Sequence, residues 1–387
     1  MENKIYLDHA ATSPIHPEVV QTMLGVMTND YGNPSSIHYA GRSARKTLDE
    51  ARSKMAGQIG ANEREIIFTS GGTEGDNTAI IGTALANQKR GKHIITSQIE
   101  HHAVLKSCMY LESLGFSVTY LPVDENGLVR VSDVRKALQE DTILVTIMYG
   151  NNEVGTIQPI AEIGELLKEH QAVFHTDYVQ AFGLVQMDVK TLGVDLLSAS
   201  AHKINGPRGT GLLYVKQGTK LEFPFHGGEQ ERARRAGTEN LAGIAGFAKA
   251  GELMAANRTE KIAEYAEFKS TMVEIFTQNE LAFEVNCANG PSLPHILSVR
   301  FHGVQVEQLL MNLDMEGIAV SSGSACTAGT VDPSHVLVAL FGENHPGVTE
   351  TVRISFGLGN TYEEVVLAAS KITDVVSRLV KRKEQKA

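Results

Sequence analysis

Apolar segments rich in β-branched residues alternate with helical segments along the first part of the chain. The segments expected to form strands are 65–70 (EIIFTS), 92–97 (KHIITS), 117–123 (SVTYLPV), 142–149 (TILVTIMY), 171–177 (QAVFHTD), 195–201 (DLLSASA) and 209–215 (GTGLLYV). Helical patterns between them lie at 43–59, 103–114 and 160–170. Buried strands that alternate with helices are typical of a mainly parallel sheet with helices on both faces. The pattern therefore predicts an α/β fold.

The pattern changes after the seventh strand, which predicts a second domain. A long helical segment is followed by two short strands and a final helix, at 243–276, 295–301, 351–356 and 362–382. Thr361 and Glu364 are spaced as a capping box that starts the final helix. A chain of 387 residues also suggests two domains. We expect a large domain over 15–250 and a smaller α+β domain made of 1–14 and 251–387.

Composition excludes several classes of protein. The formal net charge of −10 argues against a protein that binds nucleic acid through phosphate contacts. The first residues carry charges and lack an apolar run, so no secretory signal is expected. The longest apolar runs, such as 143–148, are too short to cross a membrane. Three cysteines cannot all pair within one chain, so we expect free thiols and a cytoplasmic location.

A glycine-rich segment, TSGGTEGDN (69–77), follows the first strand of the sheet and precedes a helix. In open parallel sheets, ligands bind outside the carboxyl ends of the strands. Gly71 and Gly72 allow a close backbone approach, and Thr73 would lie at a helix N-terminus, where free N–H groups favour a phosphate or a carboxylate. A turn with an ordinary helix cap explains the same letters equally well.

Two charged residues end neighbouring strands of the predicted sheet. Asp177 could pair with a cationic ring nitrogen, although an isolated Asp at this place is more often a helix cap. Lys203 follows an apolar strand and stands beside His202. A lone lysine is usually a solvated surface residue. In this setting, it could instead form a Schiff base with a carbonyl cofactor.

Further polar residues follow other strands. His101 and His102 are adjacent and would point in different directions, and no metal-site spacing is found, so no metal ion is expected. A single imidazole could stack on a flat ring and move protons near neutral pH. Asn151 and Asn152 could bind a ring oxygen or a carboxylate, or form a turn. Arg353 lies inside an apolar strand, where its partner is either a carboxylate ligand or a structural acid.

One of the three cysteines lies in a loop of small residues. The segment SSGSACTAGT (321–330) surrounds Cys326 with seryl, glycyl, alanyl and threonyl residues, and none of these can bury it. A thiolate is the reactive form of cysteine, and exposure favours it. A loop of small residues also allows movement. Cys108 lies on the apolar face of a helix and Cys287 precedes a turn, so neither is assigned a role.

Eight segments, in order, resemble the cysteine desulfurases of the NifS and IscS type, which belong to the class V aminotransferase group. The resemblance begins at YLDHAATSP (6–14), reaches the last helix, and rests on YGNPSSIH, TSGGTEGDN, EHHAVL, NNEVGTIQPI, HTDYVQAFG, SAHKINGPRGTG, RRAGTEN and SSGSACTAG. It implies fold type I of the pyridoxal phosphate-dependent transferases. In that fold, a large domain holds a mainly parallel seven-stranded sheet, and the smaller C-terminal domain is α+β.

The resemblance also implies a role for each matching residue around pyridoxal 5'-phosphate. Lys203 would carry the cofactor as a Schiff base and move the Cα proton, and Asp177 would keep the ring nitrogen protonated. His101 would stack on the ring and assist proton transfer, and Gln180 would form a hydrogen bond with the ring oxygen. The remaining cofactor contacts would come from Gly72, Thr73, Asn152, Ser200, His202 and Thr238.

The implied reaction removes sulfur from L-cysteine. Asn152 and Arg353 would hold the substrate carboxylate, and Cys326, in the loop 321–332 of the small domain, would attack the sulfur. L-Alanine would leave, and the Cys326 persulfide would pass its sulfur to an acceptor protein. Iron–sulfur cluster, tRNA thiolation and thiamine pathways all stay open as destinations. Thr238 would reach the active site of a partner subunit, which implies a homodimer.

The segment HGGEQERARRAGT (226–238) departs from the family pattern. Glu229, Ala233 and Ala236 stand where glycine, glycine and serine are expected. Two other functions stay open: another pyridoxal phosphate enzyme of the same fold, such as an aminotransferase or a selenocysteine- or sulfinate-preferring lyase, and a sulfur-carrying interaction protein without catalysis. Cys326 argues against the first, because transamination needs no cysteine. The intact Lys203 argues against the second.

Overall fold

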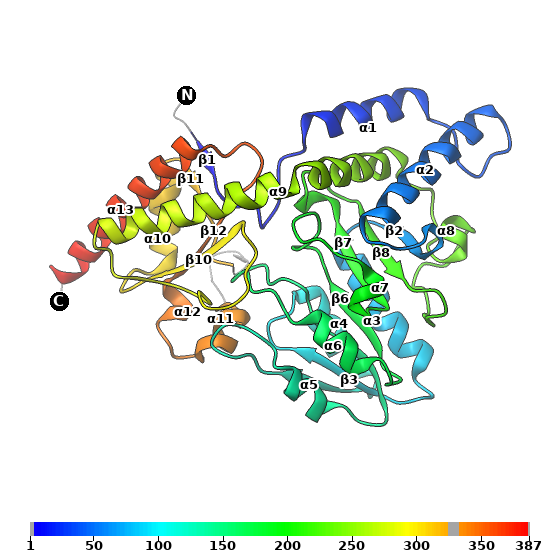
Figure 1. Ribbon diagram of the computed structural model, residues 1–387, viewed down its shortest axis with the longest axis horizontal. Helices are drawn as coiled ribbons and strands as arrows, with labels where there is room; N and C mark the ends of the chain where they lie inside the picture. The colour runs from blue at the N-terminus through cyan, green and yellow to red at the C-terminus, as the bar shows by residue number, and fades with distance from the viewer. Residues whose placement is uncertain (1–3, 324–332, 386–387) are drawn as a thin grey trace.

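The computed structural model describes residues 4–323 and 333–385, and its described part holds a seven-stranded central sheet (Figure 1). The strand order is β2-β8-β7-β6-β5-β3-β4. The strands are β2 (Ile66–Thr69), β3 (His93–Ser97), β4 (Ser117–Leu121), β5 (Thr142–Thr146), β6 (Val173–Asp177), β7 (Leu196–Ser200) and β8 (Gly211–Val215). All are parallel except β8, which pairs antiparallel with both β2 and β7. The predicted mainly parallel sheet is confirmed.

Helices cover both faces of this sheet. The helices of the large lobe are α1 (Pro17–Asn29), α2 (Tyr39–Gln58), α3 (Gly72–Asn87), α4 (His102–Ser113), α5 (Val131–Ala137), α6 (Ile160–Leu167), α7 (Val189–Leu192) and α8 (Gln230–Ala233), with short 3-10 turns at Glu63–Glu65 and Ala201–Lys203. In β3, Ile94 packs in the cluster of α3 and α4, whereas Ile95 packs in the main core on the opposite face. Because successive side chains point to opposite faces, two buried faces require a continuous apolar strand.

A smaller lobe has its own sheet and core. Strand β10 (Ile296–Phe301) pairs antiparallel with both β9 (Phe283–Val285) and β12 (Thr351–Ser355), and β1 (Ile5–Tyr6) pairs parallel with β11 (Ile318–Ala319). Its helices are α10 (Val306–Met315), α11 (His335–Phe341), α12 (Gly347–Glu350) and α13 (Tyr362–Glu384). The capping box predicted at Thr361 and Glu364 is present.

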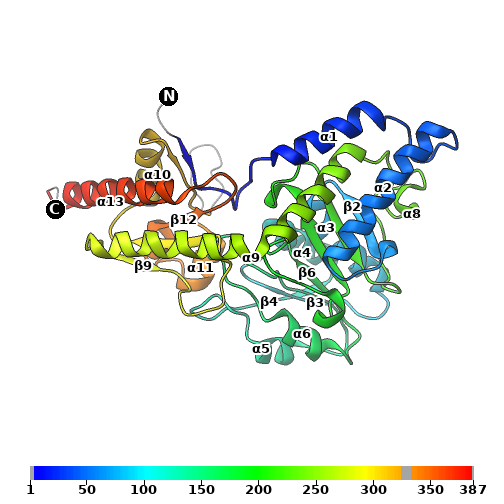
Figure 2. The same cartoon turned by 45° about the horizontal axis from the view of Figure 1, so that its top comes forward.

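One long helix runs through both lobes. Helix α9 (Leu241–Gln278) crosses from the large lobe to the small one, as Figure 2 shows. Near its start Phe247 packs in the core of the large lobe, and farther on Phe268 and Phe276 pack in the core of the small lobe. The two cores thus lie on either side of the predicted boundary at residue 250. The division into two independently organised domains stays a prediction.

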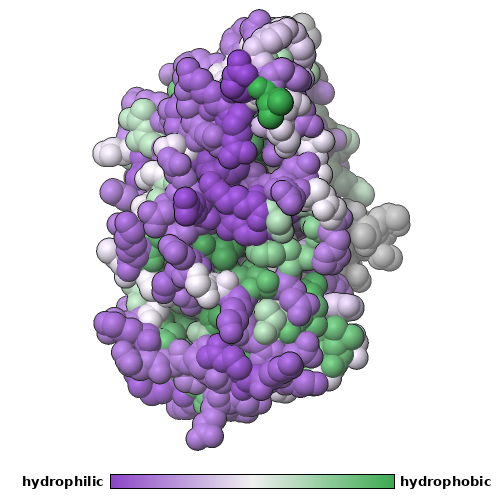
Figure 3. Space-filling view, turned by 90° about the vertical axis from the view of Figure 1, so that its right-hand side faces the viewer, coloured by the Kyte–Doolittle hydropathy of each residue, from purple (hydrophilic) through white to green (hydrophobic). Residues whose placement is uncertain are grey.

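The chain runs from the small lobe to the large lobe at its N-terminus. Ile5 and Leu7 belong to the core of the small lobe, and α1 then packs along α9 on the large lobe (Figure 1). Side chains on the end of the large lobe are mostly hydrophilic, with apolar groups gathered near the middle of that face (Figure 3). None of the described helices is long and apolar enough to cross a membrane.

Candidate active site

A cavity of about 440 Å³ lies at the carboxyl ends of the parallel strands, between the two lobes. Asp177 is the last residue of β6 and Ser200 the last of β7, so both side chains reach this edge of the sheet. Every predicted site residue that the structure describes, Thr238 excepted, lines the cavity: Gly72, Thr73, His101, Asn152, Asp177, Gln180, Ser200, His202, Lys203 and Arg353.

Lys203 projects into the cavity from the 3-10 turn that follows β7. Its Nζ donates to the carbonyl oxygens of Ala10 at 2.6 Å and Ala11 at 2.8 Å. Burial lowers the pKa of its amine from 10.5 to about 8, and the nearby charge of Arg353 acts in the same direction. A substantial fraction of the amine is therefore neutral near pH 8, and only the neutral amine is a nucleophile.

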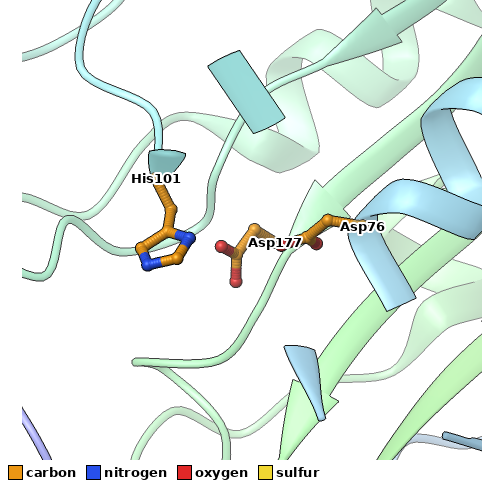
Figure 4. Close-up of side chains that lie close together, drawn as sticks. All are labelled: Asp76, His101 and Asp177. Carbon is orange, nitrogen blue, oxygen red and sulfur yellow. The ribbon is translucent and has the colours of Figure 1, made fainter. Parts of the chain in front are cut away.

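Asp177 faces His101 across the cavity, with Asp76 behind it (Figure 4). Asp177 accepts a hydrogen bond from the Val179 N–H at 2.9 Å, and burial raises the pKa of its carboxyl while His101 acts against that rise. Asp76 is completely buried, and burial raises its pKa well above the usual range. Buried acids ionise readily only beside a cation. The pair of acids thus creates a place for one positive charge.

The same three side chains could also share a metal ion, because one ligand atom of each lies within 4.8 Å of the others. His101 caps α4, and its Nδ1 accepts from the Ala103 N–H at 3.1 Å. In the neutral imidazole the proton therefore lies on Nε2. Burial lowers the pKa of His101, so the neutral form dominates near pH 7. The expected absence of a metal stays a prediction.

The first turn of α3 lines one part of the cavity and could bind an anion. Gly72 and Thr73 begin this helix, and its first N–H groups have no partner within the helix. A Cβ atom at residue 72 would lie 2.6 Å from the Val179 side chain, so any residue other than glycine would displace that side chain. Ser200 lies beside this turn, and His202 also lines the cavity. Burial lowers the pKa of His202 to about 4.

Arg353 provides a cation on the small-lobe side. It lies in β12 with its guanidinium nearly buried, and its Nη1 donates to the Asn152 carbonyl oxygen at 2.9 Å. Gln180 donates from Nε2 to the Ala10 carbonyl oxygen at 2.8 Å. Asn151 does not face the cavity: its side-chain oxygen accepts from the N–H groups of Glu153 and Val154, which is the turn role left open for it.

One predicted site residue, Thr238, lies outside this cavity. Thr238 is exposed and lines a separate small pocket beside Thr69 and Ser70. Cys326 lies outside the described residues. The two described cysteines are buried, and burial raises the pKa of the Cys108 thiol to about 12 and also raises that of Cys287. Neither is therefore a reactive thiolate, which agrees with the absence of an assigned role.

The N-terminal segment 8–13 contributes contacts that the sequence reasoning missed. Besides the Ala10 and Ala11 carbonyls, Asp8 forms an ion pair with Arg353 at 2.7 Å, and Thr12 contacts His202 at 3.1 Å. The segment matched the family motif YLDHAATSP, but no residue in it was given a role. The motif was the only sequence signal for this segment, because a hydrogen bond to a backbone carbonyl does not depend on residue type. Asp76 was also missed: it lies inside the motif TSGGTEGDN (69–77), but no role was given to it.

Residues 5–367 match the family described as aminotransferase class-V. The chain belongs to this family. It is 59% identical to a Bacillus subtilis relative that carries the name IscS 1, over 97% of this chain and 99% of that protein. It is 48% identical to the cysteine desulfurase IscS of Methanosarcina thermophila, over 98% of this chain and 93% of that protein.

Solved structures agree with this class-V assignment. A NifS-like protein superposes with a TM-score of 0.90 at 36% identity, covering 97% of this chain and all 100% of that one. The structure described as SspA in complex with cysteine has a TM-score of 0.81 at 35% identity, covering 92% and 99% of the two chains. The predicted fold type I and the predicted family, a class-V cysteine desulfurase of the NifS and IscS type, are confirmed.

Proposed function

We propose that this class-V enzyme binds pyridoxal 5'-phosphate, removes sulfur from L-cysteine and transfers it to Cys326, releasing L-alanine. The observation that carries the proposal is the placement of Lys203, with its lowered pKa, in the same cavity as the buried acid Asp177 and the cation Arg353. Named relatives support the substrate, since the similar SspA structure is described with cysteine.

The cavity fits the proposed cofactor at each of its functional ends. The first turn of α3, with Ser200 and His202, offers donors for a phosphate. Asp177 offers a buried carboxylate for a protonated ring nitrogen, and such a cation would reverse the rise in its pKa. Lys203 offers the amine for a covalent link. When bound, pyridoxal phosphate supplies an electron sink that stabilises negative charge at the substrate Cα.

Side chains of the cavity bind the substrate and transfer protons. Arg353 and Asn152 hold the carboxylate of L-cysteine and so orient its Cα. The Lys203 amine, with a pKa near 8, takes the Cα proton. His101 carries its proton on Nε2 and can donate a hydrogen bond from it inside the cavity, which assists proton transfer there. Gln180 lines the cavity with one amide hydrogen still available for the ring oxygen.

Cys326 completes the sulfur transfer. Its thiolate attacks the sulfur of the bound substrate, so an S–S bond forms as the Cβ–S bond breaks. The electron pair of the Cβ–S bond stays with the carbon fragment, which takes up protons and leaves as L-alanine. The persulfide on Cys326 is then the sulfur donor for an acceptor protein. The acceptor can belong to an iron–sulfur cluster, tRNA thiolation or thiamine pathway.

We also propose a cytoplasmic homodimer, with Thr238 reaching the active site of a partner subunit. The exposure of Thr238 and its position outside the chain's own cavity support this role. Nearby, Arg235 forms a two-bond ion pair with Glu74 of α3, at 2.9 and 3.1 Å, which ties the Thr238 segment to the phosphate-binding helix. The three cysteines are consistent with a reducing compartment.

The test compares wild type, Cys326→Ala and Cys287→Ser after loading with pyridoxal phosphate. The measurements are alanine release from L-cysteine, persulfide on the protein, and the visible spectrum of the bound cofactor. We expect Cys326→Ala to remain yellow but to form neither product, and Cys287→Ser to behave as wild type. Alanine release at the wild-type rate by Cys326→Ala would instead favour another lyase or a transaminase.

A further inference from the structure

Arg353 is held by two protein acceptors before any substrate is present. Its Nη2 donates to Asp8 Oδ1 at 2.7 Å, and its Nη1 donates to the Asn152 carbonyl oxygen at 2.9 Å. Only 6% of the Arg353 side chain is exposed, and 21% of the Asp8 side chain. A guanidinium is planar and carries five N–H donors in fixed directions. Two bonds from different nitrogens therefore fix the plane, and the remaining hydrogens keep a set direction.

Asp8 is itself fixed by the backbone of the small lobe. Its neighbour Leu7 accepts from the Ser355 N–H at 2.8 Å, and the Ala10 N–H donates to Ser355 Oγ at 2.9 Å. The Tyr6 hydroxyl donates to the Asp8 carbonyl oxygen at 3.0 Å. Asp8 thus forms a parallel β-bridge with Ser355 of β12, the strand that also carries Arg353. The backbone that carries the carboxylate is therefore held against the strand that carries Arg353.

We propose that Asp8 is a positioning residue that aims Arg353 at the α-carboxylate of the substrate and so makes the enzyme selective for amino acids over simple amines. This inference rests on the proposed function, because it assigns the ligand of Arg353. Arg353 lines the cavity beside Asn152 and Lys203, with N–H groups left over from its two protein bonds. Because the guanidinium is already oriented, little of its side-chain conformational entropy is lost when a carboxylate binds.

The charges around the cavity support the same role. Arg353 lowers the pKa of Lys203, and Asp8 acts in the opposite direction. Asp8 therefore offsets part of the positive charge that Arg353 brings to the lysine. A purely structural ion pair is the competing explanation, since Leu7 and Val352 also pack together in the core of the small lobe. The positioning role predicts that loss of Asp8 weakens the binding of carboxylate-bearing ligands only, whereas a structural role predicts the same effect on all ligands.

The experiment measures the affinity of the loaded enzyme for L-alanine and for ethylamine by titrating the visible spectrum of the cofactor. These two amines differ only by the carboxylate, and neither carries a thiol that would start turnover. We expect Asp8→Ala to weaken L-alanine binding about tenfold and to leave ethylamine binding within about twofold, the size of one lost charge-assisted contact. KM for L-cysteine should rise similarly, with kcat changing less.

Asp8→Asn keeps an acceptor oxygen without the charge and serves if Asp8→Ala does not fold. We expect it to weaken L-alanine binding about threefold, again with ethylamine unchanged, because neutral hydrogen bonds are weaker. Equal changes for both amines, or no change for either, would overturn the proposal. Arg353→Ala is the matched control. If Arg353→Ala binds L-alanine as tightly as wild type does, then Arg353 does not bind the substrate carboxylate. That result contradicts the proposed function, independently of the result for Asp8.

Discussion

At the scale of single residues, the site depends on charged groups placed where water is scarce. Lys203, Asp177 and His101 are ordinary side chains whose pKa values are shifted chiefly by their surroundings. Lysine loses its proton more easily when buried, and an acid keeps its proton longer. The carbonyls of Ala10 and Ala11 add no charge but hold the Lys203 amine in place. The chemistry therefore resides in the environment as much as in the residue types.

The pKa of Lys203 predicts how the cofactor-free protein takes up pyridoxal phosphate. The neutral amine fraction grows with pH and levels off above a pKa of about 8, whereas an ordinary lysine keeps gaining until about 10.5. We expect the uptake rate, followed by absorbance, to rise up to about pH 8 and then flatten. Lys203→Arg should show no such uptake. A rate that still rises tenfold per pH unit above 9 would mean that burial does not shift this amine.

The same shift predicts the pH dependence of stability. Between about pH 8 and 10.5 the unfolded chain keeps a proton on this lysine that the folded cofactor-free chain has lost. The unfolded state then binds more protons, so the free energy of unfolding contributed by Lys203 increases with pH in this window. Below pH 8 both states are charged, and this contribution no longer changes. Urea unfolding of wild type and Lys203→Met across the window measures the difference.

At the scale of elements, the segment 226–238 shows why the family pattern has a glycine that this chain lacks. Glu231, Arg232 and Ala233 all have left-handed backbone angles, with φ of 48°, 61° and 60°. The turn is held by the buried ion pair of Glu231 with Arg52 at 2.6 Å, and the Phe68 N–H also donates to Glu231. Glycine adopts this conformation without a Cβ penalty.

Ala233→Gly should therefore stabilise the protein. Relief of the left-handed strain outweighs the extra freedom of glycine in the unfolded chain, for a net gain of about 1 kcal/mol in the free energy of unfolding. The matched control is Ala236→Gly, because Ala236 is not among the residues with positive φ. That change should destabilise slightly. The urea unfolding midpoints of wild type and the two variants measure these changes. A loss of stability in Ala233→Gly would show that the backbone is not strained at residue 233.

At the scale of the whole molecule, the active site exists only because two lobes meet. Asp177 and Lys203 come from the sheet of the large lobe, Arg353 comes from the small lobe, and the N-terminal segment 8–13 passes between them. Helix α9 is continuous across the junction and, at 1.5 Å per residue, is roughly 57 Å long. We predict that this continuous helix contributes to the spacing between the lysine and the arginine.

Breaking α9 at its exposed middle tests this role. Ala256 is exposed, so Ala256→Pro disturbs the backbone rather than a packed side chain, and should lower the free energy of unfolding by about 3 kcal/mol or more. We also expect KM for L-cysteine to rise, because Arg353 would lose its fixed distance from Lys203. Ala256→Gly, which keeps the N–H, should cost about 1 kcal/mol with KM unchanged. Unaltered KM in Ala256→Pro would show that the helix does not set this distance.

The sequence by itself determined the α/β class, the strands of the sheet, the capped final helix and the side chains that gather at the strand ends. Periodicity and short motifs are local, and the edge where parallel strands end is the same in every such sheet. Tertiary structure alone decided that Asp8 pairs with Arg353, that Ala10 and Ala11 hold Lys203, and which groups are buried. These contacts join residues hundreds of positions apart, and burial, which shifts their pKa values, is a property of the packed molecule.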